Sequence, residues 1–152
     1  MEQWQKSLVE GEKQLTADRR DVHQYAETGW TEYRTAAKVA ERLEQLGYTL
    51  TVGRNALCEE DRMGVPTDEV LARHETRALQ QGTPEKWLAQ MRGGFTALWA
   101  DLDCGEGPFV ALRFDLDAND CVESTEEEHR PQAEGFASVQ VGAMHACGHD
   151  GH

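Results

Sequence analysis

The last eight residues of the sequence, HACGHDGH, combine a thiol, three imidazoles and a carboxylate, all of which can bind metal ions. Thiolate and imidazole are ordinary ligands of zinc, and ligands two residues apart can converge on one ion from an irregular loop. Cys147 and His149 have this spacing. No second cysteine pair has the spacing of a closed structural zinc site, so an open, catalytic site is favoured. The alternatives are a solvated tail that binds metal adventitiously, or a Cys147 that is only a small buried side chain.

A second candidate group is the pair of carboxylates in RFDLDA, Asp115 and Asp117. Side chains alternate along a strand, so the two would lie on the same side of a strand end and could face a metal. Asp117 could also accept the second ring N–H of a metal-bound histidine and so orient it. The alternative is a solvated strand end without a ligand role.

Helices and strands must position these groups, and the sequence predicts several of them. Apolar residues at helical spacing predict a helix over residues 4–25, with Trp4 and Leu8 on its apolar face, and a second helix over 32–46. Thr31 can cap the second helix, and Gly47 follows it as a stop. The alternating YTLTV run at residues 48–52 predicts a strand.

The middle of the chain is more polar. Residues 54–94 have the character of an insertion, with short helices expected over 68–81 and 84–91. FTALWADLD and PFVALRFDLD, separated by CGEGP, predict a hairpin of neighbouring strands. Residues 119–135 are strongly acidic and predict a surface loop over a site.

Composition limits the classes of partner. The 152 residues carry a formal net charge of −13, from 28 acidic and 15 basic residues, which disfavours nucleic acid and anionic membranes. No apolar run is long enough to span a bilayer, and the start lacks the apolar stretch of a secretory signal, so the cytoplasm is expected. The four cysteines are too scattered for a disulfide framework and are expected to be reduced.

Three stretches carry a family resemblance: RRDVHQYAETGWTEYRTAAKVAERLEQLGY, ALRFDLDA and GAMHACGHDGH. In this order they resemble the aminoacylase and hippurate-hydrolase branch of the metallopeptidase and amidohydrolase superfamily. The long segment at about residues 54–94 is similar to the A-subunit group of p-aminobenzoyl-glutamate hydrolases within that branch. The resemblance implies an α/β fold, the amino-terminal and incomplete part of a zinc-peptidase-like catalytic domain with helices packed on a mixed sheet. The family's inserted dimerisation domain would be absent.

The resemblance also implies residue roles. The thiolate of Cys147 would bind or bridge two divalent ions, Mn or Zn, His149 would bind one of them, and Asp117 would be the supporting catalytic carboxylate. Four further side chains match with a structural or less certain role: Asp115, His145, Asp150 and His152. Two departures from the branch pattern, Ala26 and Asn119, remove no ligand but make the transfer of substrate from simpler relatives less secure.

The implied reaction is hydrolysis of an N-acyl amino acid. The first candidate substrate is p-aminobenzoyl-glutamate, which would give p-aminobenzoate and glutamate. The general base and the remaining ligands would lie beyond His152, so the isolated chain is expected to be inactive. The full-length form is expected to be a homodimer or to pair with a related second subunit. The alternatives are an amidohydrolase or carboxypeptidase with another N-acyl substrate, such as hippurate-like or indole-acetyl conjugates, and a metal-binding remnant without catalysis.

Three further histidines are interpreted without a metal role. His23 and Glu27 have the helical spacing of a ligand pair, but a hydrogen-bonded histidine at a helix end is favoured. His74 and His129 lie in polar stretches and are expected to face solvent.

Overall fold

A computed structural model describes residues 2–152, with the side chains of residues 3, 4 and 8 left out. The expected apolar positions Trp4 and Leu8 therefore lie outside the described side chains. The chain divides into two compact units, one made of residues 27–117 and the other of residues 1–26 and 118–152. Each unit is described by itself.

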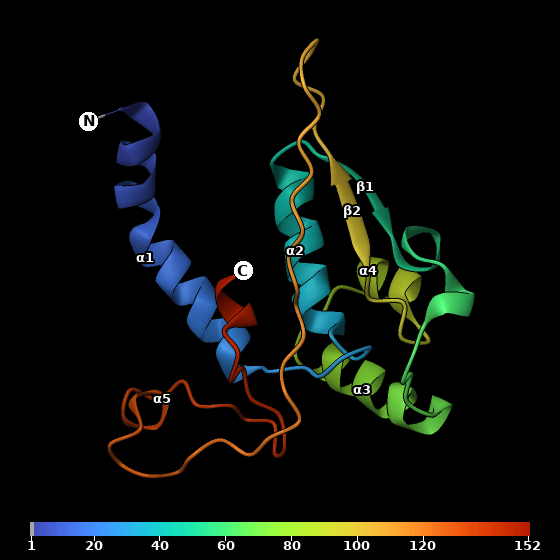
Figure 1. The fold of residues 1–152 in the computed structure, drawn as a ribbon. Helices are drawn as coiled ribbons and strands as arrows, with labels where there is room; N and C mark the ends of the chain where they lie inside the picture. The colour runs from blue at the N-terminus through green and yellow to red at the C-terminus, as the bar shows by residue number, and fades with distance from the viewer. Residues whose placement is uncertain (1) are drawn as a thin grey trace. The chain divides into compact units, whose positions relative to one another are not determined.

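The unit of residues 27–117 contains three helices and a pair of strands in its described residues (Figure 1). Its elements are α2 (Tyr33–Gln45), β1 (Thr49–Val52), α3 (Asp68–Gln80), α4 (Glu85–Met91) and β2 (Leu98–Asp101). Short 3-10 turns at Gly53–Ala56 and Glu59–Asp61 follow β1. The bounds confirm the helices and the first strand that the sequence predicts, to within one or two residues.

The core of this unit lies between α2, α4 and one face of the strand pair. Small side chains of α2 allow the close approach of Trp87, Leu88 and Met91 from α4. The other buried members are Tyr33, Ala36, Ala37, Ala40, Val52 and Ala78, and Leu50, Leu98 and Leu116 pack against them. The polar segment at residues 54–94 thus supplies a large part of the hydrophobic core.

The pairing of the strands differs from the predicted hairpin. β2 pairs with β1 in antiparallel register, from Thr49 opposite Asp101 to Val52 opposite Leu98. Residues 108–117 are fully described and form no strand. Leu50 and Leu98 both face the core, so burial selects β1 as the partner of β2, whereas local β propensity cannot choose between partners.

The apolar side chains of the unpaired run are consequently in water. Phe109, Val110, Leu112 and Phe114 are all exposed. The strand that the sequence predicts here, and that would align Asp115 and Asp117, is therefore not formed in this described stretch, and the prediction of that strand is wrong.

The start of α2 is capped from a distance. The buried carboxylate of Glu27 accepts hydrogen bonds from the backbone N–H groups of Arg34 at 3.2 Å and Thr35 at 2.8 Å. These N–H groups have no partner within a helix, so the carboxylate replaces a local cap. The predicted cap, Thr31, instead donates its hydroxyl to the carbonyl of Thr28 at 2.7 Å.

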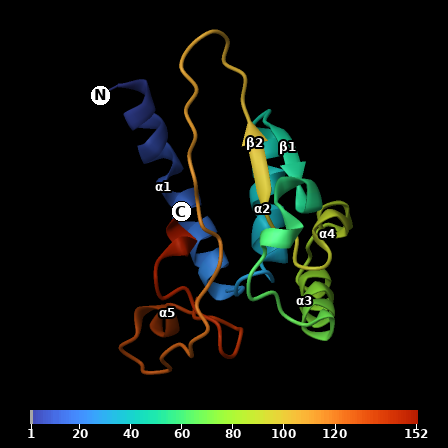
Figure 2. The ribbon, with the colours of Figure 1, turned by 45° about the vertical axis from the view of Figure 1, so that its right-hand side comes forward.

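The other unit is built on α1 (Gln3–Gln24), which confirms the first predicted helix. A short helix, α5 (Arg130–Ala133), and a final 3-10 turn, His149–Gly151, interrupt an otherwise irregular segment. Figure 2 shows this last segment returning to the end of α1. Ala26, Ala118 and Ala143 form a small buried cluster there.

None of the helices among the described residues is both long enough and apolar enough to cross a membrane.

Candidate metal-binding loop

The loop that carries Cys147 and His149 belongs to the unit that contains α1. Gly148 has a φ of 90°, in the left-handed region that favours glycine, and this turn separates the two candidate ligands. The thiol of Cys147 is free and the residue is exposed, whereas His149 is partly buried. The rings of His149 and His152 stack with their centroids 5.0 Å apart.

Asn119 holds the loop on one side. Its side-chain oxygen accepts hydrogen bonds from the backbone N–H groups of Ala146 at 3.1 Å and Cys147 at 3.2 Å. Its backbone also forms an isolated antiparallel bridge with Met144. The residue that departs from the family pattern therefore positions the backbone of the candidate ligand Cys147.

Asp150 holds the loop on the other side. Its buried carboxylate lies 2.9 Å from Nδ1 of His23 and 3.2 Å from the guanidinium of Arg19, both on α1. The second oxygen of Asp150 is also buried and has no hydrogen-bond partner among the described residues. His145, at the start of the loop, is buried with its ring centroid 6.3 Å from that of His23.

Glu123 continues this network within the same unit. One of its oxygens lies 2.8 Å from Nε2 of His23 and 2.8 Å from Nε2 of His129, and the other accepts the backbone N–H of Ser138. Burial alone would raise the pKa of Glu123, but the hydrogen bonds from His23, the Ser138 amide and His129 hold it below the usual range. The expectation that His129 simply faces solvent is wrong. No local pattern points to this contact.

Asp115 and Asp117 lie in the unit of residues 27–117, and both are partly buried. Arg113 donates a hydrogen bond to Asp115. The supporting role of Asp117 stays a prediction.

The two residues weighed as a helical ligand pair have separate partners. His23 binds Asp150 and Glu123, which confirms the hydrogen-bonded helix-end histidine. Glu27 lies in the unit of residues 27–117, where Arg77 donates to it at 2.9 Å.

Buried groups of that unit have shifted pKa values. Burial raises the pKa of Glu27, although Arg77 and the amides of α2 oppose the shift. Burial also raises the pKa of Glu32 to about 7, against a hydrogen bond from Thr96. His74, expected to face solvent, is partly buried, and desolvation lowers its pKa to about 4. None of these three side chains belongs to the loop that carries Cys147.

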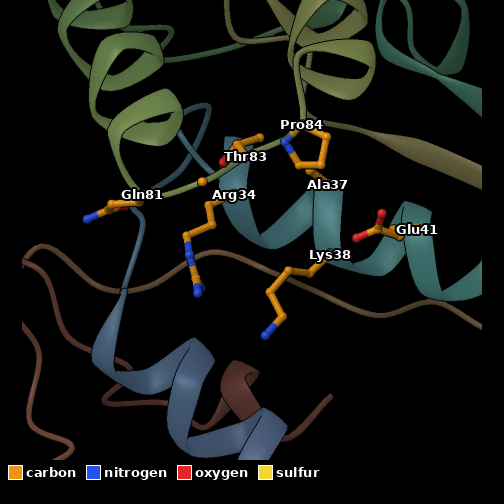
Figure 3. Close-up of a pocket in the computed structure, with 8 residues that line it drawn as sticks. Arg34, Ala37, Lys38, Glu41, Gln81, Thr83 and Pro84 are labelled. Carbon is orange, nitrogen blue, oxygen red and sulfur yellow. The ribbon is translucent and has the colours of Figure 1, made fainter.

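The same unit has a small cavity beside α2 (Figure 3). Its volume is about 110 Å³, and Figure 3 shows Arg34 and Lys38 projecting to the same side of α2. Ligand pockets for drug-sized molecules have about 300–1,000 Å³, so this cavity is too small for an aromatic N-acyl amino acid.

The side chains of the loop fit a zinc or manganese ion in their chemistry. Cys147 offers an accessible thiol and His149 offers an imidazole. Asn119 holds the backbone at Cys147, and the contact of Asp150 with His23 holds the residue next to His149. A catalytic zinc ion takes three protein ligands and an open position. Cys147 and His149 would supply part of such a set.

Comparison with known proteins identifies the class. No protein-family model matches the sequence. The chain is 55% identical over 140 residues to indole-3-acetyl-aspartic acid hydrolase of Enterobacter agglomerans, covering 91% of this chain and 32% of the relative. It is 53% identical over 135 residues to the A-subunit of p-aminobenzoyl-glutamate hydrolase from Escherichia coli K12, covering 88% of this chain and 31% of that relative.

A solved structure gives the same relationship. The aminobenzoyl-glutamate utilization protein of Klebsiella pneumoniae matches with a TM-score of 0.76 and 47% identity, over 78% of this chain and 30% of that one. The chain is therefore a homologue of these amidohydrolases and has part of their fold. Within the class it is similar to the A-subunit of p-aminobenzoyl-glutamate hydrolase and to indole-3-acetyl-aspartic acid hydrolase, which confirms the resemblance seen in the motifs. It spans about a third of the length of either.

Proposed function

We propose that the chain is part of a metal-dependent amide hydrolase and carries the Cys147–His149 portion of a two-metal site. The observation that carries this proposal is an accessible thiol two residues before an imidazole, on a loop held from both sides by Asn119 and Asp150. Sequence identities of 55% and 53% to two named hydrolases support the proposal.

Each group of the loop has a role in this proposal. Bound divalent ions would polarise the scissile carbonyl and lower the pKa of a water molecule. Cys147 and His149 would hold the ions, and Asn119 would fix the backbone at Cys147. Asp117 would be the supporting catalytic carboxylate, while His145, Asp150, His152 and Asp115 would have structural or orienting roles. The remaining ligands and the general base would come from the rest of the whole protein.

The names of the relatives guide the choice of substrate. p-Aminobenzoyl-glutamate and indole-3-acetyl-aspartate both join an aromatic acyl group through an amide to an acidic amino acid. We propose p-aminobenzoyl-glutamate as the substrate of the whole protein, with indole-3-acetyl-aspartate as the second candidate. We also propose that the whole protein forms a homodimer or pairs with a second subunit, since one relative is named as a subunit.

Equilibrium dialysis of the chain against Zn²⁺ or Mn²⁺ tests the site. The proposal predicts that Cys147→Ala and His149→Ala each weaken binding by about tenfold or more, because each removes a ligand. Cys58→Ala is the matched control, since Cys58 is also an exposed free thiol. Equal binding by all of these variants would contradict the assignment. The isolated chain is expected to release no p-aminobenzoate with either metal, and activity above that of Cys147→Ala would contradict this expectation.

A further inference from the structure

His23 joins two segments that are distant in the sequence. It lies in the last turn of α1, and its side chain is 4% exposed. Nδ1 lies 2.9 Å from Asp150, and Nε2 lies 2.8 Å from Glu123. An ionised carboxylate only accepts hydrogen bonds, so two such partners would each take an N–H from the imidazole ring.

Both partners of His23 are held by further contacts. Glu123 also binds His129 and the Ser138 amide, and Asp150 also binds Arg19. Glu123 is thus fixed to its own surroundings. His23 links that fixed carboxylate to Asp150.

Asp150 directly follows the candidate ligand His149 in the sequence. If the Nδ1 contact were lost, a buried carboxylate would lose a hydrogen bond that compensates for its burial. The turn His149–Gly151 would then be free to move Asp150 toward water, and His149 would move with it. Arg19 could not hold the turn alone, because its side chain is 52% exposed.

We infer that His23 is a positioning residue for the metal-binding loop, because its Nδ1 holds Asp150 against α1 and thereby sets the place of His149. The inference rests on the proposed function for the identity of the ligands. Hydrogen-bond partners that orient metal ligands change metal affinity by about 10–100-fold when they are mutated, and His23 acts on His149 through the adjoining Asp150.

Two substitutions of His23 test the contacts of its two ring nitrogens separately. The amide nitrogen of asparagine can occupy the place of Nδ1, and that of glutamine the place of Nε2. His23→Asn therefore keeps the donor to Asp150, whereas His23→Gln keeps the donor to Glu123 and loses the one to Asp150. Phe136→Leu is the matched control, because this ring packs edge-on against His23 at 5.6 Å without taking part in the bridge.

Cobalt binding provides the first readout. Co²⁺ bound by a thiolate gives a charge-transfer band, which Cys147→Ala should abolish. Titration with Co²⁺ should show about wild-type affinity for His23→Asn and Phe136→Leu, and at least about tenfold weaker affinity with an altered spectrum for His23→Gln. Equal affinity and spectra for His23→Asn and His23→Gln would overturn the inference.

Hydrogen exchange provides a second readout that does not depend on metal. In the metal-free chain, His23→Gln should speed exchange of the amides of Gly151 and His152, which close the final turn, and His23→Asn should not. Unchanged exchange at these amides in His23→Gln would also overturn the inference. A wild-type chain without a Cys147-dependent band would overturn the proposed metal site, and the exchange measurement would still decide whether His23 fixes the loop. Far-ultraviolet circular dichroism checks that each variant retains the helix content of the wild type.

Discussion

The guanidinium of Arg77 on α3 lies 2.9 Å from the fully buried carboxylate of Glu27, which caps α2. Arg77 also donates to the carbonyl of Thr31 at 3.3 Å. One ion pair thus ties α3 to the segment that precedes α2.

Replacement of Arg77 by Met should destabilise the unit of residues 27–117. The change leaves a buried carboxylate unpaired, which costs about 3–5 kcal/mol. Urea unfolding followed by tryptophan fluorescence measures the loss. Arg92→Met is the control, because that side chain is 45% exposed and its ion pairs should contribute less than about 1 kcal/mol. Similar losses for the two variants would contradict the prediction.

Glu32 should make the stability of this unit depend on pH. Its pKa is about 7 in the folded chain and 4.5 for the ordinary group, so the folded state binds the proton more tightly. Its contribution is therefore fully present below pH 4.5 and is lost as the pH rises through 7, by up to about 3 kcal/mol.

Comparison with Glu32→Gln isolates this contribution, because Gln can still accept the hydroxyl of Thr96. The variant should gain stability relative to wild type between pH 5 and 8, as measured by urea unfolding at several pH values. His74 changes the stability in the opposite direction, because its lowered pKa costs stability as the pH falls below 6.5. This effect is present in both proteins and cancels in the comparison. A constant difference across this pH range would refute the assignment.

Gly53 should tolerate no side chain. Its φ is 77°, and an added Cβ would meet the carbonyl oxygen of Gln90 at 1.9 Å. Because backbone must shift, Gly53→Ala should cost about 3 kcal/mol or more. Gly47→Ala has a similar φ of 87° but open space around the new Cβ, and should cost about 1 kcal/mol. Thermal unfolding of both variants measures the difference, and equal costs would show that the close approach to Gln90 is wrong.

Leu88 tests whether the segment at residues 54–94 forms part of the core. The side chain is fully buried against α2, so Leu88→Ala should cost about 2–5 kcal/mol. Leu79→Ala is the control, because Leu79 is 42% exposed and should cost less than about 1 kcal/mol. A small loss at Leu88, measured by urea unfolding, would mean that α4 packs outside the core.

Local patterns predicted the local elements of the fold. Apolar spacing and the stop at Gly47 placed α2 to within a residue, and the alternating YTLTV run placed β1. The partner of β2 could not be predicted in this way, because two β-prone runs compete for it and burial of Leu50 and Leu98 selects between them.

The candidate site was predicted only in part, for the same reason. The density of ligand types marked Cys147 and His149 from the sequence. The contacts that hold their loop join residues far apart in the chain, such as His23 with Glu123 and Asp150. Asn119 was noticed as a departure from the family pattern, but its hydrogen bond to the Cys147 amide depends on tertiary structure.

The most direct test of the central claim is the release of p-aminobenzoate from p-aminobenzoyl-glutamate by the whole protein, supplied with Mn²⁺ or Zn²⁺. Cys147→Ser should lower kcat/KM by at least about 100-fold, since it replaces a metal-binding thiolate by a much weaker ligand. Cys58→Ser should leave the rate unchanged. Wild-type activity in Cys147→Ser would contradict the claim that this loop binds the catalytic metal.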